Sequence, residues 1–422
     1  MTLKKDALAY HCLDGKPGKI SVEATKPLES QADLSLAYTP GVAEPVKEIM
    51  LDPQAVYQYT SKGNLVAVIT NGTAILGLGN QGPLAAKPVM EGKGVLFKKF
   101  AGVDVFDIEV NEVDPDAFIR IVAGIAPTFG GINLEDIKSP ECFYIEKQLQ
   151  KMLDIPVFHD DQHGTAIVLG AAFLNALEIV GKKPDQVKVV FSGAGAAAIA
   201  CARHLLRIGV CKENIWMVDL HGLVYIGRKE EMFLEKEIFS QGYQPATLGQ
   251  VIEGADVFIG LSAADVLKPD MLLKMNPDPI IFAMANPNPE IDFNLARQTR
   301  PDAIVASGRS DYPNQINNVL CFPFLFRGAL DVRASEINDE MKMAASQALA
   351  ALAHEPVPTE MLQLYGVKEL SFGRDYLLPK ALDKRVCLYV ASAVAQAAMQ
   401  SGVARIQVDM GIYTGCLREN YG

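Results

Sequence analysis

One segment near the middle of the chain strongly limits what the protein can fold into. Residues 187–206 read VKVVFSGAGAAAIACARHLL, an apolar β-branched run, a glycine-rich turn and an alanine-rich stretch with helical character. Gly193, Gly195 and Ala198 fit a G-x-G-x-x-A pattern, which permits a tight turn, close approach of a pyrophosphate and tight helix–strand packing. The free N–H groups at the start of the helix favour an anion. The segment therefore predicts a dinucleotide-binding unit.

The residues that follow support this interpretation. The next apolar run, Ile215–Val218, ends in Asp219, close to the place where an acid bonds a ribose hydroxyl in such folds. A second G-x-G-x-x-G pattern, at 77–82, follows Asn71-Gly72 and precedes a proline. It lacks the strand and helix context, so we interpret it as a turn close to a ligand.

Composition narrows the classes of protein that fit. The chain has 422 residues, which predicts two or three domains, and a net charge of −11, which argues against a nucleic-acid partner. It has no run of 18 apolar residues and no apolar core near its N-terminus, so neither a membrane span nor a signal peptide is expected. The seven cysteines form no C-x-x-C pair, which predicts reduced thiols in a cytoplasmic protein.

Alternating short apolar runs and helical patterns predict an α/β fold. We expect a Rossmann-type doubly wound parallel sheet and a separate N-terminal α/β domain, which C-terminal helices complete. The expected domains are 1–160, 161–325 and 326–422, the last packing back on the first and leaving a cleft between domains. The expected strands are 65–70, 94–97, 103–108, 132–134, 156–159, 187–191, 215–218, 257–259, 280–283 and 303–306. The main expected helices are 114–126, 139–153, 164–180, 341–354 and 384–400.

Acidic pairs follow two of these strands. Glu135 and Asp136 come after 132–134, and Asp160 and Asp161 come after 156–159. Carboxylates in such places suit Mg²⁺ or Mn²⁺, although acids that cap the next helix would give the same pattern. His159 and His163 are four residues apart, but the acids between them break the H-E-x-x-H pattern, and we expect no two-histidine site.

Other polar residues could carry chemistry. Lys93 stands between two glycines, which predicts either an accessible general base in a turn or an ordinary solvated lysine. Tyr38, in AYTPGVA, is either a general acid or a loop anchor. Asn286 and Asn318 could bond a carboxylate or amide, although Asn286 before a proline also fits an Asx turn. Thr165 is expected to open a helix that faces the cofactor.

Together these segments resemble malic enzyme over nearly the whole chain. The residues that carry the resemblance are YTPGVAEP at 38–45, ILGLGNQG at 75–82, EGKGVLFKKFAGVD at 91–104, NLEDI at 133–137, FHDDQHGTA at 158–166, SGAGAAA at 192–198, ANPNPE at 285–290 and NQINNVLCFPFLFRGALD at 314–331. The version is similar to the bacterial hybrid type, which is usually NADP-linked and in longer members adds a phosphotransacetylase-like domain. The resemblance leaves open whether this chain is a free-standing catalytic unit or part of a longer one.

The resemblance implies oxidative decarboxylation of L-malate to pyruvate and CO₂, with NADP or NAD as cofactor and Mg²⁺ or Mn²⁺ as metal. It implies Lys93 as general base, Tyr38 as general acid and Asp160 as support for the base. It assigns Glu135, Asp136 and Asp161 to the metal and Lys93, Asn286 and Asn318 to the substrate. The implied cofactor residues are Thr165, Ser192, Gly193, Ala194, Gly195, Ala196, Ala197, Ala198, Asp219 and Asn286. A homo-oligomer, a dimer or larger, is expected.

One departure from the family pattern, the cofactor preference and several alternatives stay open at this point. Larger malic enzymes carry a substrate-clamping arginine where this chain has Ala74. Asp219 favours NAD, but His221, Arg228 and Lys229 could reach a 2′-phosphate, and the hybrid type favours NADP. The alternatives are an enzyme similar to amino-acid dehydrogenases, which needs no metal, a non-catalytic nucleotide-sensing module, and malolactic conversion to lactate.

Overall fold

The N-terminal half of the protein is built on a small parallel sheet. The computed structural model describes residues 3–15 and 17–421. The sheet has the order β2-β1-β3-β4, and every pairing in it is parallel. Its strands are β1 Leu65–Thr70, β2 Asp104–Glu109, β3 Gly131–Leu134 and β4 Val157–His159. The helices between them are α5 Pro83–Ala101, α6 Pro115–Ile125 and α7 Glu141–Met152. Because β3 and β4 are parallel neighbours, the residues that follow them meet at one edge of the sheet.

The second sheet has the doubly wound arrangement that the sequence predicts. Its order is β10-β9-β8-β5-β6-β7, and all pairs are parallel except β6 with β7. The strands are β5 Val189–Ser192, β6 Ile215–Asp219, β7 Gly222–Leu223, β8 Val257–Gly260, β9 Ile280–Ala283 and β10 Ile304–Ser307. The helices along this part are α9 Ala196–Ile208, α10 Leu234–Glu237, α11 Leu248–Val251, α12 Pro269–Leu272 and α13 Phe293–Thr299. The chain leaves β5 in one direction and returns on its other side at β8, which opens a ligand crevice at the carboxyl ends of the strands.

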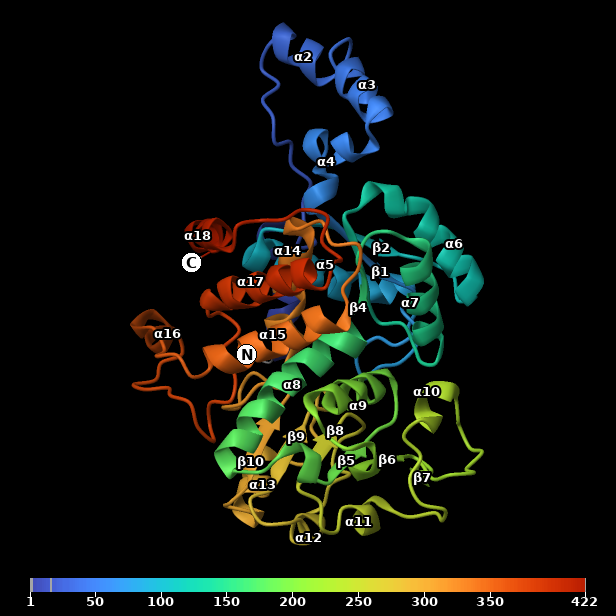
Figure 1. Ribbon diagram of the computed structural model, residues 1–422, viewed down its shortest axis with the longest axis vertical. Helices are drawn as coiled ribbons and strands as arrows, with labels where there is room; N and C mark the ends of the chain where they lie inside the picture. Colours follow the sequence, from blue (N-terminus) through green and yellow to red (C-terminus); the bar gives the residue numbers. More distant parts are fainter. Residues whose placement is uncertain (1–2, 16, 422) are drawn as a thin grey trace.

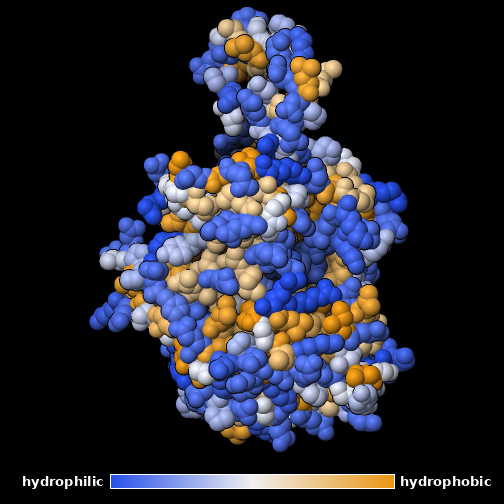
Figure 2. Space-filling view, viewed as in Figure 1, coloured by the Kyte–Doolittle hydropathy of each residue, from blue (hydrophilic) through white to orange (hydrophobic). Residues whose placement is uncertain are grey.

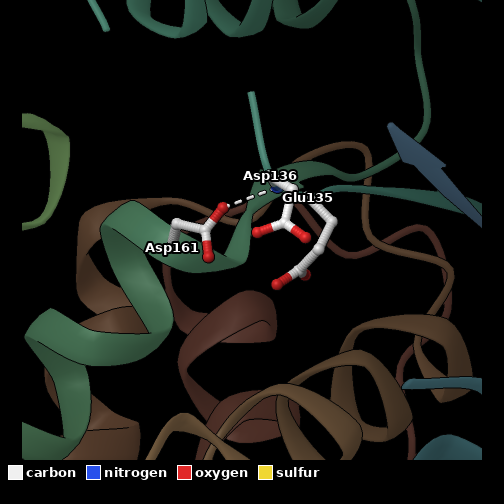
Figure 3. A group of neighbouring side chains, drawn as sticks. All are labelled: Glu135, Asp136 and Asp161. Atoms are coloured by element: carbon white, nitrogen blue, oxygen red, sulfur yellow. Dashed lines mark hydrogen bonds between the residues drawn. The ribbon is translucent and has the colours of Figure 1, made fainter. Parts of the chain in front are cut away.

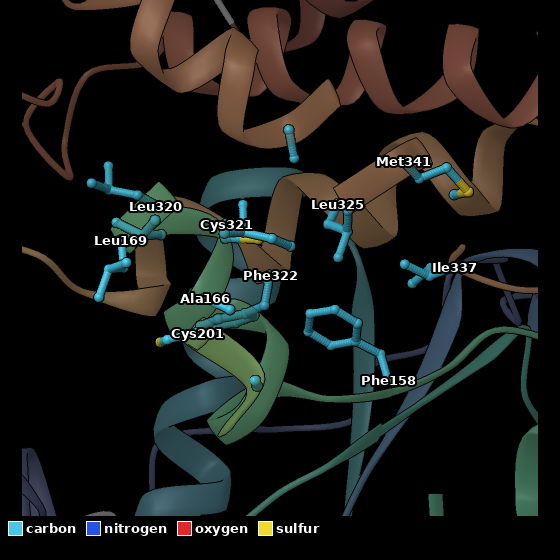
Figure 4. Packing of buried hydrophobic residues seen from close by; sticks show 14 of the residues in the cluster. Phe158, Ala166, Leu169, Cys201, Leu320, Cys321, Phe322, Leu325, Ile337 and Met341 are labelled. Atoms are coloured by element: carbon cyan, nitrogen blue, oxygen red, sulfur yellow. The ribbon is translucent and has the colours of Figure 1, made fainter. Parts of the chain in front are cut away.

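The C-terminal helices return to the first sheet. They are α14 Phe322–Asp331, α15 Asp339–Leu352, α16 Thr359–Leu364, α17 Arg385–Gln400 and α18 Met410–Tyr421. Phe97 of α5 meets Phe322 and Phe326 of α14, with ring centroids 4.9 and 5.4 Å apart. Figure 4 shows Phe322 and Phe158 in the same apolar cluster, which joins α14 to β4 and α8. This packing confirms the expected fold class.

Helix α8, Asp160–Val180, joins the two sheets (Figure 1). It is the one helix in the described part of the chain that is long and apolar enough to cross a membrane. Of its most apolar stretch of 18 residues, 67% is buried inside the molecule, so other elements of the chain cover it. Its apolar composition is therefore explained by packing against α9 and α15.

An arm projects from the N-terminal sheet (Figures 1 and 2). It contains α2 Gln31–Ala37, α3 Ala43–Leu51 and α4 Val56–Tyr59, and none of these helices has a buried residue. Several large apolar side chains on it face solvent, among them Leu36, Met50 and Leu51 at 75, 78 and 83% exposure. Exposed apolar surface on this scale marks an interaction site. The first helix of the chain is α1 Leu3–Tyr10, and the 3₁₀ turns are 13–15, 53–55, 61–64, 126–128, 184–186, 212–214 and 318–320.

Two predicted elements are wrong. The expected strand 94–97 lies inside helix α5, where Met90, Phe97 and Ala101 are buried on one face. A four-residue apolar run does not distinguish strand from helix, and the flanking glycines of Lys93 concealed the helical spacing. The expected start of a helix at Gly164 is also wrong, because α8 begins at Asp160.

Candidate active site at the edge of the first sheet

Three carboxylates converge where β3 and β4 end. Glu135 and Asp136 follow β3, and Asp161 lies in the first turn of α8 directly after β4. One carboxylate oxygen from each lies within 4.8 Å of the others, as Figure 3 shows. The Asp136 backbone N–H donates to Asp161 Oδ2 at 2.7 Å, which fixes the two segments to each other. Asp136 has φ +53°, a conformation uncommon for a residue with a side chain and typical of functional sites.

The electrostatics of this group fit a cation. Burial and the neighbouring carboxylates raise the pKa of Asp136 to about 8, and burial raises the pKa of Glu135 to about 7. Asp136 Oδ2 is buried and has no hydrogen-bond partner among the described residues. Buried like charges and an orphaned oxygen are costly unless a positive charge joins them. The three residues therefore fit a divalent metal with oxygen ligands.

Lys93 supplies one positive charge to the group. Its ammonium is hydrogen-bonded to Asp160, lies 3.0 Å from Glu135 Oε1 and stands 4.3 Å from the centre of the Phe322 ring. Burial alone would lower the pKa of Lys93, but Asp160, Glu135 and Asp161 outweigh it and raise that pKa above its ordinary value. The expectation of an exposed turn is wrong, because the residue is buried within α5. A buried amine surrounded by carboxylates indicates a functional site far more specifically than a lysine between two glycines does.

Asp160 links Lys93 to the second domain's side of the site. Asn318 Nδ2 donates to Asp160 Oδ2 at 2.6 Å, so the substrate candidate Asn318 reaches the same group as the base candidate. Burial raises the pKa of Asp160 to about 7. A Cβ on Gly164 would lie 1.8 Å from Asp160 Oδ1. The glycine is therefore a requirement of this carboxylate's position within the helix, not the helix start that the sequence indicated.

Tyr38 is not brought to this site within one chain. It terminates α2 at the outer part of the arm, with 69% of its surface exposed. Figure 1 places α2 far from the start of α8, where the carboxylates lie. The site of a single chain consequently lacks the tyrosine that the resemblance assigns to it.

The dinucleotide loop has the predicted geometry. Gly193 has φ +109°, and a Cβ there would lie 2.5 Å from the carbonyl oxygen of Leu261. Gly195 precedes α9 without any side-chain cap, so the N–H groups at the start of that helix are open to a phosphate. A Cβ on Gly195 would meet only Ser139 Oγ, at 3.9 Å, which leaves room for a ligand.

The other predicted cofactor residues lie along the same crevice. Ser192 Oγ is 2.8 Å from Ser262 Oγ, across the β5–β8 edge. Ala194, Ala196, Ala197 and Ala198 continue the loop into α9, and Thr165 lies on the second turn of α8. Asn286 is exposed after β9, and a Cβ on Gly77 would lie 2.8 Å from its carbonyl oxygen. The 77–82 turn thus packs against the loop that carries Asn286.

The carboxylate of Asp219 is held by two cationic side chains. Its carboxylate accepts hydrogen bonds from both terminal nitrogens of Arg228, from Lys236 Nζ at 2.8 Å and from the His221 backbone N–H at 2.9 Å. Although burial opposes it, these bonds lower the pKa of Asp219 to about 2. One negative charge therefore stands against two positive charges at the end of β6.

Sequence reasoning missed two buried acids that organise the site. Glu146 of α7 accepts from the His159 backbone N–H and from the His163 ring, both at 3.0 Å. Glu290 accepts from the backbone N–H groups of Ser262 and Ala285, at 2.8 and 3.1 Å, and so joins the loops after β8 and β9. Glu146 could have been found as a charged residue on the apolar face of its helix. Glu290 lies in a loop, where no periodic signal exists.

Comparison with known families agrees with this geometry. Residues 17–150 match the malic enzyme N-terminal domain, and residues 162–372 match the malic enzyme NAD-binding domain. The chain belongs to the malic enzyme family.

Individual malic enzymes are similar over nearly the whole chain. The NADP-dependent malic enzyme of Escherichia coli (strain K12) is 58% identical over 421 residues, which are 99% of this chain and 55% of that protein. The NADP-dependent malic enzyme of Halomonas elongata is 57% identical over 95% of both chains. The crystal structure of malic enzyme from Pyrococcus horikoshii Ot3 is 46% identical, with a TM-score of 0.88 over 100% of this chain and 96% of that one. The chain spans about half the length of the first of these relatives.

Proposed function

We propose that the protein catalyses the oxidative decarboxylation of L-malate to pyruvate and CO₂, with reduction of NADP⁺. The observation that carries this proposal is the buried Lys93 ammonium inside a set of carboxylates at the edge of the first sheet. The second domain provides a dinucleotide loop, and Asn318 reaches the carboxylate group from the 3₁₀ turn that precedes α14. An enzyme similar to amino-acid dehydrogenases would have no use for three clustered metal-type carboxylates.

Glu135, Asp136 and Asp161 would hold the divalent ion, Mg²⁺ or Mn²⁺. When bound, the ion supplies Lewis-acid stabilisation of negative charge on the substrate oxygen, and the nicotinamide supplies the hydride acceptor. The positive charge of the ion would offset the carboxylates that now raise the pKa of Lys93. Lys93 could then accept the proton of the C2 hydroxyl.

Asp160 and Asn318 act on either side of that lysine. Asp160 orients the amine and offers a carboxylate for the proton to reach next, since the two side chains are hydrogen-bonded. Asn318 donates to Asp160 with one amide hydrogen and has a second one for a substrate carboxylate. Asn286 would bond the substrate or the cofactor amide at the nicotinamide end. These groups partly replace the arginine that is absent at Ala74.

The charges at the end of β6 support NADP⁺ over NAD⁺. In an NAD-type site the acid after this strand is free to accept from a ribose hydroxyl. Here both Asp219 oxygens are engaged by Arg228 and Lys236, so this acid is not free to accept from a ribose hydroxyl. A positive field favours the extra 2′-phosphate, which a free acid would repel.

We infer that Tyr38 acts in the site of a second copy of the chain, which would make the protein a homodimer or a larger oligomer. The arm exposes several large apolar side chains, and Tyr38 at the end of α2 lies far from α5, which carries Lys93. As the general acid that protonates the enol carbon, it would account for about 10²–10⁴-fold in rate. With reduced cysteines and no disulfide among the described residues, we propose a cytoplasmic location.

The test of the reaction is turnover of purified protein with L-malate and Mn²⁺, with NADP⁺ and NAD⁺ supplied separately. Cofactor reduction that matches pyruvate formation and stops with chelator is the expected result. Lactate as product, or no turnover by a folded protein, would overturn the proposal.

The test of the shared site is complementation. Tyr38→Phe and Lys93→Ala should each be nearly inactive, but mixed and refolded or co-expressed they should recover about a quarter of wild-type activity, since half of random dimers carry one intact site of two. A tyrosine that serves its own chain would give no recovery in the mixture.

A further inference from the structure

A polar cavity lies outside the site described above. It has a volume of about 350 Å³ and is bounded by α7, α8, α9, α10 and α15. That size is at the lower end of cavities that enclose small metabolites. Its lining residues on α9, from Ala200 to Arg207, lie beyond the dinucleotide loop, and eight residues of helix from Gly195 to Arg203 correspond to about 12 Å. The cavity is therefore separate from the phosphate-binding turn.

Positive charge gathers on this cavity. Lys147, Arg203, Arg207 and Lys342 line it, and in Figures 1 and 2 strongly hydrophilic surface lies where α7, α8 and α9 converge. Lys342 is the deepest of the four, with 12% of its side chain exposed and a contact to Asp339 at 3.4 Å. Lys147 and Arg203 form no ion pair with any described residue.

The lining carries more cations than carboxylates. Its acids are Glu146, Glu235 and Asp339, against four cationic side chains. Asp339 is paired with Arg207 and contacts Lys342, and Glu146 accepts hydrogen bonds from His163 and Gln162. The cations outnumber the acids by one, and Lys147 and Arg203 form no ion pair with a described residue, which favours an anionic ligand.

The cavity wall is shared with the metal-type carboxylates. Gln162 and His163 line the cavity and directly follow Asp161 in the first turn of α8. Both side chains bond Glu146, at 3.2 and 3.0 Å, and Glu146 also holds the backbone N–H of His159 before Asp160. A molecule that contacts Gln162 or His163 therefore acts on the turn that positions Asp160 and Asp161.

We propose that this cavity is a second ligand site, for a small metabolite with an anionic group, and that its occupancy changes the affinity of the carboxylate cluster for a divalent ion. Arg203 and Lys342 bind the anionic group, and Gln162 and His163 carry the effect to α8. The effect on metal affinity rests on the proposed metal site. Binding of a ligand in the cavity does not depend on that site, so the two parts of the proposal can fail separately.

The test is calorimetric titration of the full chain, saturated with NADP⁺, with three probes: inorganic phosphate, succinate and 2-phosphoglycolate. We expect one probe to bind once per chain and to bind at least about tenfold more weakly to Arg203→Ala and Lys342→Ala, the loss of one charge-assisted hydrogen bond each. Lys151→Ala, exposed on α7 and outside the cavity, is the matched control and should bind as the wild type does. Asn318→Ala, in the substrate site, should also bind normally.

The outcomes separate the alternatives. No binding of any probe at about 10 mM, or binding that neither cavity variant weakens, would overturn the site. Binding lost in Asn318→Ala would assign the probe to the substrate position instead. With the effective probe bound, the Kd for Mn²⁺ should shift several-fold in the wild type and not in Arg203→Ala; an unchanged Kd would remove the coupling and leave the site.

Discussion

The two domains each place an aspartate at the carboxyl end of a parallel strand, with opposite electrostatic results. At the end of β4, Asp161 joins Glu135 and Asp136, and burial with like charges raises their pKa values. At the end of β6, Asp219 faces two cations, and its pKa falls to about 2. The carboxylates of the first group outnumber their one cation, Lys93, whereas Asp219 is one carboxylate held by two cations. The residue type is the same, and the neighbouring side chains decide whether its pKa rises or falls.

The comparison also explains why the sequence indicates the partners of one aspartate more clearly than those of the other. The partners of Asp161 are two residues that follow another strand, visible as a second acidic pair. The partners of Asp219 lie nine and seventeen residues downstream, in a loop and a short helix. The sequence indicated Arg228 as a group that could reach a 2′-phosphate but gave no sign of Lys236, and in the folded chain both hold the acid.

The largest effect is expected from a change in the carboxylate group at the end of β4. Asp161→Asn should lower kcat/KM for malate by at least about 10²–10³-fold, because it removes a metal ligand and with it charge stabilisation in the transition state. Steady-state kinetics over a range of Mn²⁺ concentrations measure this. Asp154→Asn, an exposed acid on the loop before β4, is the control and should be near wild type. Full activity of Asp161→Asn would show that the cluster holds no catalytic ion.

The second largest effect is expected from the loss of one of the two cations that hold Asp219. Lys236→Gln should lower kcat/KM for NADP⁺ by about 10–100-fold, the value of one charge-assisted hydrogen bond, and leave the value for NAD⁺ nearly unchanged. The ratio of the two cofactors' kcat/KM is the measurement. Lys229 is exposed in the loop before α10, and Lys229→Gln tests whether the loss of any nearby positive charge lowers kcat/KM for NADP⁺ to the same extent. An equal loss with both cofactors would contradict a role in selecting the 2′-phosphate.

A smaller effect is expected from removing the acid itself. Asp219→Asn keeps the shape and leaves Arg228 and Lys236 without their counter-charge. NADP⁺ should bind equally well or more tightly, because the change removes one negative charge from the place proposed for the 2′-phosphate. Fluorescence titration with NADPH and NADH measures the change. A tenfold loss of NADH affinity would mean that Asp219 does bond the ribose.

The smallest effect concerns stability against pH. Because the folded-state pKa values of Glu135, Asp136 and Asp160 lie at about 7 to 8, these three carboxyls bind more protons in the folded chain than in the unfolded chain between pH 4 and 8. The buried His159, His163 and His204, whose pKa values burial lowers, act in the opposite direction below about pH 6.5. Stability without metal should therefore fall most clearly above about pH 6.5, by a few degrees in Tm. Mn²⁺ should reverse the fall, measured by thermal denaturation with and without chelator. A metal-free Tm that rises from pH 6 to 8 would contradict this.

The sequence predicted the fold class, and the structure brings the two acidic pairs, Lys93 and Asn318 to one edge of the first sheet. The dinucleotide turn, the second sheet and the acidic pairs depend on local patterns, in which strand, turn and helix signals agree. The surroundings of Lys93 were mispredicted because its four-residue apolar neighbour fits a strand as well as a helix. Asp160 with Gly164 was misjudged because the close approach of a carboxylate to a helix glycine is a tertiary contact. The separation of Tyr38 from Lys93 leaves no trace in a linear sequence at all.

Helix α8 has a mechanical consequence. Its first turn carries Asp160 and Asp161, and its 21 residues extend about 31 Å into the second domain. With that lever, a tilt of roughly 5° about its far end displaces the carboxylates by roughly 2.7 Å, comparable to an entire metal–oxygen bond. A rotation of the second domain that tilted α8 by this much would therefore move Asp161 relative to Glu135 and Asp136, which are fixed to the first sheet.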